Sequence, residues 1–145
     1  MRRIDHIVFH CTAGNQRNSA ADIVAMHTAA PPRGNGWRRP GYHILVTADG
    51  VAHNLVPLDD IANGAKGFNA HAIHIAYTGG VDLSRKVNGQ WPPLDNRTPA
   101  QRATLTAIAA SLHARFPGAR IVGHRDLNPA KSCPSFDAAK EYAAL

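Results

Sequence analysis

Several residue types and patterns are scarce in this sequence, and each shortage excludes a class of protein. Two cysteines in 145 residues are too few for the disulfide framework of a small secreted domain. Apolar runs such as Ile44-Leu45-Val46 are far shorter than the roughly 18–20 residues that cross a bilayer, so we expect no membrane partner. Asp5 interrupts the apolar stretch that follows the N-terminal arginines, which predicts synthesis in the cytoplasm without a signal peptide.

Long basic tracts are missing as well. Lysine and arginine together number 16 and the acidic residues 10, for a formal net charge of +6. Because the basic residues are scattered along the chain, we expect no dedicated nucleic-acid site. The net positive charge still favours a polyanionic partner, such as an acidic cell-wall polymer, through long-range attraction.

The rest of the composition is that of one folded domain. The chain is 44% hydrophobic and 18% charged, unlike a disordered protein, and its length suits a single domain over residues 1–145. Hydrophobic periodicity and turn residues predict strands at 3–10, 42–47, 51–54, 72–77 and 120–123, and helices at 19–30, at 98–116 and after a cap at Ser135 or Asp137. This order predicts an α/β fold with a central mixed sheet of about five strands flanked by helices.

Three residues have the chemistry of a metal site. His10 ends one predicted strand, His124 directly follows another, and Cys133 lies in a proline-containing loop nine residues after His124. Two histidines and a cysteine match a catalytic zinc site, which keeps its fourth position open for water. Spacing alone leaves another interpretation open, in which both histidines are ordinary strand-end residues and Cys133 is a buried thiol.

Four strings resemble, in order, the zinc-dependent N-acetylmuramoyl-L-alanine amidases. They are Val8–Ala13, Gly36–His43, Gly123–Asp126 and Lys131–Pro134. This is the family of amidase-type bacteriophage lysozymes and peptidoglycan recognition proteins, and the resemblance covers nearly the whole chain. It implies a zinc-dependent hydrolase of the endolysin type.

The resemblance also implies a role for each site residue. The zinc ligands of the family correspond to His10, His124 and Cys133, and its active-site tyrosine and lysine to Tyr42 and Lys131. Asp137 is an alternative carboxylate ligand. We prefer Cys133 because thiolate binds zinc strongly, whereas Asp137 stands where a helix cap is useful.

Amide hydrolysis agrees with these roles. Zinc can acidify a water and polarise the scissile carbonyl, but a proton acceptor is still needed. The single glutamate, Glu141, lies outside every motif, which disfavours a glutamate base. Tyr42 is a candidate to orient the water or relay its proton, and Lys131 to stabilise the oxyanion. The alternatives are a sheet tyrosine and a solvated lysine.

Other residues near these motifs receive weaker expectations. His43 alternates with Tyr42 and is expected to be structural on the opposite face. His71 and His74 either support the site or are satisfied polar residues at strand ends. Cys11 is expected to be a small buried hydrophobe, with a nucleophilic thiol as the alternative. Trp37 either lines a substrate groove or packs in the fold.

The expected function is hydrolysis of the amide between N-acetylmuramic acid and the L-alanine of the peptidoglycan stem peptide. We expect a monomer with no separate wall-binding domain. It would act on the wall after release by another route, or on cytoplasmic muropeptides. The alternatives are a peptidoglycan-recognition module without catalysis and a protein that binds a partner through its basic surface.

Overall fold

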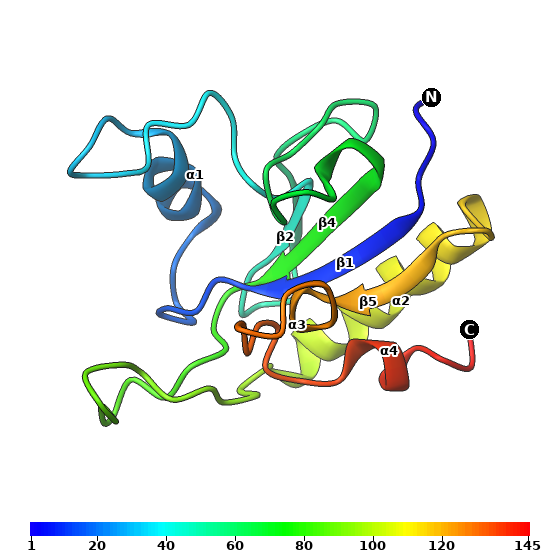
Figure 1. The fold of residues 1–145 in the computed structure, drawn as a ribbon. Helices are drawn as coiled ribbons and strands as arrows, with labels where there is room; N and C mark the ends of the chain where they lie inside the picture. The colour runs from blue at the N-terminus through cyan, green and yellow to red at the C-terminus, as the bar shows by residue number, and fades with distance from the viewer.

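A five-stranded sheet forms the centre of the fold in the computed structural model, which describes residues 1–145 (Figure 1). The strands are β1 (His6–Cys11), β2 (Ile44–Val46), β3 (Ala52–Asn54), β4 (Ala72–Tyr77) and β5 (Arg120–Gly123). Their order is β3-β2-β4-β1-β5, and only the β2–β3 hairpin pair is antiparallel. The prediction of a mixed sheet of about five strands in an α/β fold is confirmed.

The central strands are buried on both sides. All six residues of β4 and five of the six in β1 are buried, as expected for parallel strands that helices cover on both faces. Side chains alternate between the faces, so Phe9 and Cys11 point to one side and His10 to the other. Burial on both faces explains why these strands read as nearly continuous apolar runs in the sequence.

Helices cover the sheet unequally. They are α1 (Ala20–Thr28), α2 (Pro99–Arg115), α3 (His124–Leu127) and α4 (Ala138–Glu141), with a 3₁₀ turn at Asn69–His71. Leu105 and Ala109 of α2, with Ala138 of α4, pack in the main core. On the opposite face Ile23 of α1 packs against Leu45 and Ala76. Figure 1 shows α1 set apart from α2 and α4 across the sheet.

The helix ends agree with the sequence signals. Ser19 and Thr98 both cap their helices within reciprocal capping boxes, with Asp22 and Gln101 as the third residues. Asp137, and not Ser135, caps α4. No helix is long and apolar enough to span a membrane.

Two predicted boundaries were wrong. Strand β2 begins at Ile44, so Tyr42 precedes the strand instead of lying within it. Strand β1 begins at His6 instead of Arg3, whereas β5 has the predicted bounds, so His124 directly follows it, as expected, and opens the short helix α3. His124 and Tyr42 therefore both lie just outside a strand and not within it.

An ionic cluster attaches α4 to the rest of the molecule. The Arg97 side chain is 1% exposed and contacts Asp95 at 2.9 Å and Glu141 at 2.8 Å. Its guanidinium carbon also lies 3.4 Å from the ring centroid of Phe136. Because Phe136 follows closely on the Cys133 loop, this cluster helps to fix that loop.

Candidate metal centre

The sheet topology brings the three predicted ligands together. Strands β1 and β5 are parallel neighbours, so His10 near the end of β1 and His124 just beyond β5 lie at the same edge of the sheet. The possible ligand atoms of His10, His124 and Cys133 all lie within 4.8 Å of one another. The Nδ1 atom of His10 is 3.7 Å from the Sγ atom of Cys133.

Two backbone N–H groups hold the Cys133 loop, one at the end of β1 and one at the start of α3. The Cys11 N–H donates to the Cys133 sulfur at 3.2 Å. The Arg125 N–H donates to the Cys133 carbonyl at 2.8 Å. The thiol is therefore placed by the end of β1 and the start of α3 together, which explains how a residue distant in sequence reaches His10.

The histidines of the cluster are in the form that binds metal. Burial, with His74 as the next contributor, lowers the pKa of His10 well below its ordinary value. Burial and the positive charge of Lys131 lower the pKa of His124. Both imidazoles are therefore neutral at pH 7 and each has a lone pair to donate.

The cysteine requires a cation to ionise. The neighbouring Cys11 thiol and burial raise the pKa of Cys133. The group therefore stays a thiol at neutral pH unless a positive charge stabilises its thiolate. A neutral pair of imidazoles and one thiol, with no carboxylate among them, is a donor set that suits zinc and can hold a metal ion.

The cluster faces a cavity of about 230 Å³. Tyr42 and Lys131 both line it, so the structure brings all five predicted site residues together. The Tyr42 ring lies 5.3 Å from that of His10, and its hydroxyl is 3.5 Å from the Cys11 carbonyl oxygen. Burial raises the pKa of Tyr42, so the phenol is protonated. Lys131 is exposed at the same cavity.

Trp37 and His27 form another wall of the cavity. The His27 ring lies between those of Trp37 and Tyr42, at 5.0 and 5.1 Å between centroids. Its Nδ1 accepts the Gly41 N–H at 3.0 Å. For Trp37 the sequence left two alternatives open, a substrate groove or packing in the fold, and the residue lines the cavity. His27 was missed because it lies in a helix with no motif, and only the fold brings α1 to this cavity.

Of the remaining candidates, only Cys11 lines the cavity. Asp137 is half exposed and serves as a helix cap, and Glu141 pairs with Arg97. His71 is exposed and contacts the Arg3 carbonyl. The Cys11 side chain is in the main core, packed so closely on Gly80 that a β-carbon there would clash with it, which agrees with a small buried hydrophobe.

His43 and His74 lie behind the cluster. Both side chains are 0% exposed, and neither lines the cavity. His74 is in the middle of β4, not at a strand end, and its Nδ1 atom is 2.9 Å from the Nε2 atom of His10. It therefore contacts a predicted ligand directly.

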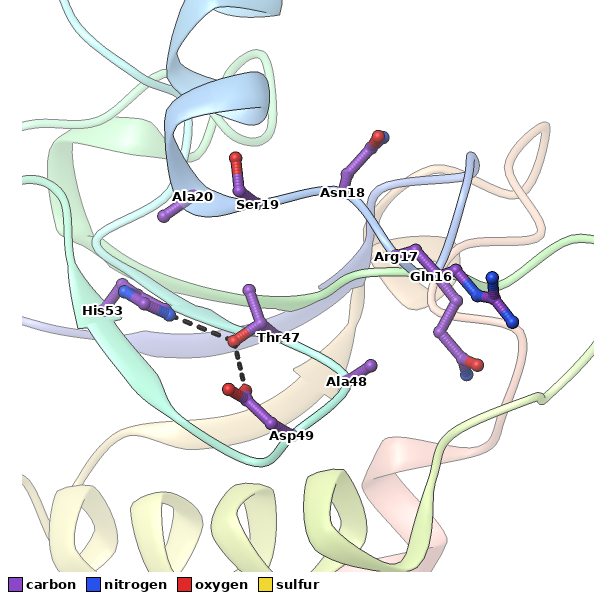
Figure 2. Close-up of a pocket in the computed structure, with 9 residues that line it drawn as sticks. All are labelled: Gln16, Arg17, Asn18, Ser19, Ala20, Thr47, Ala48, Asp49 and His53. Atoms are coloured by element: carbon purple, nitrogen blue, oxygen red, sulfur yellow. Dashed lines mark hydrogen bonds between the residues drawn. The ribbon is translucent and has the colours of Figure 1, made fainter.

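A separate polar hollow lies between the segment before α1 and the β2–β3 turn (Figure 2). Thr47 donates a hydrogen bond to Asp49 at 2.6 Å and contacts His53 Nε2 at 3.0 Å. A catalytic threonine would instead donate to the histidine. These contacts stabilise the hairpin turn and do not form a second catalytic centre.

Comparison with known proteins identifies the family of this chain. The endolysin of Escherichia phage T7 is 33% identical over 137 residues, which are 92% of this chain and 82% of the phage protein. A solved endolysin from a Thermus scotoductus bacteriophage has a TM-score of 0.77 and 28% identity, over 99% of this chain and 85% of that one. An N-acetylmuramoyl-L-alanine amidase from Clostridium intestinale has a TM-score of 0.76 and 25% identity over the same shares. A family model described as N-acetylmuramoyl-L-alanine amidase matches residues 1–136, and the chain therefore belongs to the N-acetylmuramoyl-L-alanine amidase family.

Proposed function

We propose that this peptidoglycan amidase is zinc-dependent and cleaves the amide between N-acetylmuramic acid and the L-alanine of the stem peptide. The observation that carries the proposal is the His10, His124 and Cys133 cluster, which opens onto a cavity that also contains Tyr42 and Lys131. Three protein donors beside an open cavity are typical of catalytic zinc, whereas structural zinc sites use four.

The three ligands would hold the metal, and the other residues would act on the substrate. Zinc bound there supplies Lewis acidity toward the scissile carbonyl and lowers the pKa of water. The protonated Tyr42 phenol is fixed near His10 and orients the attacking water by a hydrogen bond. Lys131 places a positive charge at the same cavity, where it stabilises the oxyanion of the tetrahedral intermediate.

The alternative of a recognition module without catalysis uses the same fold. A binding module needs the cavity but not a complete set of metal donors, a partly buried phenol and a lysine beside it. The presence of all five groups at one cavity favours the enzyme.

The substrate proposal follows from charge and cavity together. A net charge of +6 favours an acidic wall polymer whose peptides carry carboxylates. We propose that the protein acts as a monomer. It would act on the cell wall after release from the cytoplasm, or on cytoplasmic muropeptides.

The first test is mass spectrometry of the products from purified peptidoglycan. The protein is assayed as isolated, after treatment with a chelator and after zinc is restored. We expect free stem peptides that begin at L-alanine, lost with the chelator and regained with zinc. Intact peptidoglycan under all three conditions would contradict the proposed activity, and undiminished cleavage in the chelated protein would contradict zinc dependence.

The ligand assignment is tested with the two cysteines as a matched pair. We expect Cys133→Ala to abolish hydrolysis and to lose most of the zinc affinity, measured by competition with a coloured chelator. Cys11→Ala removes a thiol that lies in the core, so it should lower stability but keep zinc binding and activity. Full activity in Cys133→Ala would refute the assignment, and loss of hydrolysis with intact zinc binding in Cys11→Ala would favour Cys11 as nucleophile.

A further inference from the structure

Three buried or partly buried side chains form a hydrogen-bonded series behind His10. His10 Nε2 lies 2.9 Å from His74 Nδ1, and His74 Nε2 lies 2.9 Å from Asn69 Oδ1. The series runs away from the cavity, from β1 through β4 to the 3₁₀ turn. It leaves only the Nδ1 atom of His10 facing Cys133.

The far end of the series has a fixed polarity. The Ala65 backbone N–H donates to the same Asn69 side-chain atom at 2.8 Å. A backbone N–H needs an acceptor, so this atom is the amide oxygen, and it has a second lone pair for His74. Asn69 therefore accepts from His74 and cannot donate to it through this atom.

That polarity determines the tautomer of each histidine in turn. His74 must carry its proton on Nε2 to donate to Asn69, which leaves a lone pair on Nδ1. His10 must then carry its proton on Nε2 to donate to His74. The remaining lone pair of His10 is on Nδ1, the atom that faces Cys133 and the cavity. Each ring donates one hydrogen bond and accepts another, which matches the one donor and one acceptor of a neutral imidazole.

We propose that His74 is a positioning residue that selects the metal-binding tautomer of His10. The proposal rests on the zinc site described above and adds a residue that does not touch the substrate. A histidine ligand commonly donates its other N–H to a carboxylate or a carbonyl, which fixes its tautomer and orientation. Here a neutral imidazole takes that place, so the tautomer is fixed without adding a negative charge behind the metal.

The surroundings of His74 prevent its ring from turning. Its side chain is 0% exposed, and the His43 ring stacks on it with 5.8 Å between centroids and an interplanar angle of 12°. His43 Nδ1 also accepts the backbone N–H of His74 at 2.9 Å. On the other side, a β-carbon at Gly64 would come within 2.5 Å of the His74 ring. A ring so confined presents the same atom to His10 throughout.

Two variants of His74 with similar side-chain shapes distinguish its role as a hydrogen-bond acceptor for His10 from its role in packing. Asparagine and leucine have nearly the same shape, but only His74→Asn offers an oxygen close to the place of Nδ1. We expect zinc affinity, measured by chelator competition, to fall about 10- to 100-fold in His74→Leu and to stay within a few-fold of the parent in His74→Asn. In the zinc-free proteins, ¹⁵N NMR of the imidazoles should show His10 protonated on Nε2 in the parent and His74→Asn, and the Nδ1-protonated form in His74→Leu.

The outcomes distinguish this inference from the zinc proposal itself. If the parent binds no zinc, the metal proposal fails. If the parent binds zinc and His74→Leu keeps both its affinity and its His10 tautomer, or if both variants lose affinity equally, the positioning role is refuted. Asn69→Leu provides a second measurement should His74→Leu not fold. It removes the acceptor that fixes the tautomer of His74 but leaves the His74 side chain in place in β4. An unchanged His10 tautomer and affinity in Asn69→Leu would also refute the proposal.

Discussion

At the scale of single residues, the two groups proposed to act on the substrate differ in how firmly they are held. The Tyr42 phenol packs against His10 and lies close to a backbone carbonyl. Lys131 is exposed and has no ion-pair partner within 4 Å, so its ammonium remains free to follow the reacting oxygen. We therefore expect Lys131 to make its main interaction with the oxyanion of the transition state, and not with a group of the free enzyme.

This difference predicts the effect of Lys131→Met. A charge that acts mainly on the developing oxyanion contributes more to the transition state than to substrate binding, so we expect kcat to fall about 10²- to 10³-fold while KM changes little. Zinc affinity should be retained. Lys140→Met on α4 is the control, because Lys140 does not line the cavity. A rise in KM with unchanged kcat would instead identify Lys131 as a substrate-binding group.

At the scale of elements, Gln101 fastens the long helix to the sheet. Its side chain is 0% exposed, accepts the Thr98 N–H at 3.0 Å and donates to the carbonyls of Val46 and Thr78 at 3.2 and 3.0 Å. Those carbonyls stand at the ends of β2 and β4. The capping box of α2 is thus also the joint between the helix and two strands.

The two capping boxes should therefore respond differently to the same change. Gln101→Ala leaves the buried Thr78 carbonyl without its side-chain donor, removes one of the two donors to the Val46 carbonyl, which keeps the Thr78 N–H, and removes the helix cap. We therefore expect it to lower the free energy of unfolding by about 2–4 kcal/mol. Asp22→Ala removes the equivalent residue of the exposed box on α1, and should cost about 1 kcal/mol or less. Urea denaturation measures both, and equal losses would show that Gln101 is only a helix cap.

Most helices and strands were predictable from the sequence, but the contacts between distant strands were not. Buried parallel strands and capped helices were predicted within a few residues, because local patterns encode them. The five site residues were assigned through motif resemblance. His74 could not be given its place next to His10, because that contact depends on the register of β1 against β4, in which Val8 pairs with His74. Register between distant strands has no local signal.

At the scale of the whole molecule, the Arg97 cluster predicts a loss of stability in acid. Hydrogen bonding to Arg97 lowers the pKa of Glu141, and it lowers the pKa of Asp95 against the opposing effect of burial. A carboxyl whose pKa is lowered by folding contributes stability above its ordinary value, here 4.5 for Glu141 and 3.8 for Asp95. That contribution disappears as the pH falls through the lower folded values.

Glu141→Gln tests this linkage. The variant keeps the shape of the side chain but cannot lose a charge, so the free energy of unfolding should be about 1 kcal/mol lower than the parent at pH 7. The difference should shrink as the pH falls below about 4. Asp5→Asn is the control, because its pair with Arg3 is exposed and contributes little. Unfolding curves in denaturant across pH check both, and a constant difference would contradict the linkage.

The wide separation of the ligands along the chain has a consequence for biosynthesis. His10 leaves the ribosome early, but Cys133 follows 123 positions later, and β5, which sets His124 beside His10, comes from the same late stretch. The proposed zinc site therefore cannot assemble on a partly synthesised chain. A nascent or prematurely terminated product that ends before Cys133 would carry the strands of a hydrolase without its activity, so translation itself delays the appearance of a wall-degrading enzyme.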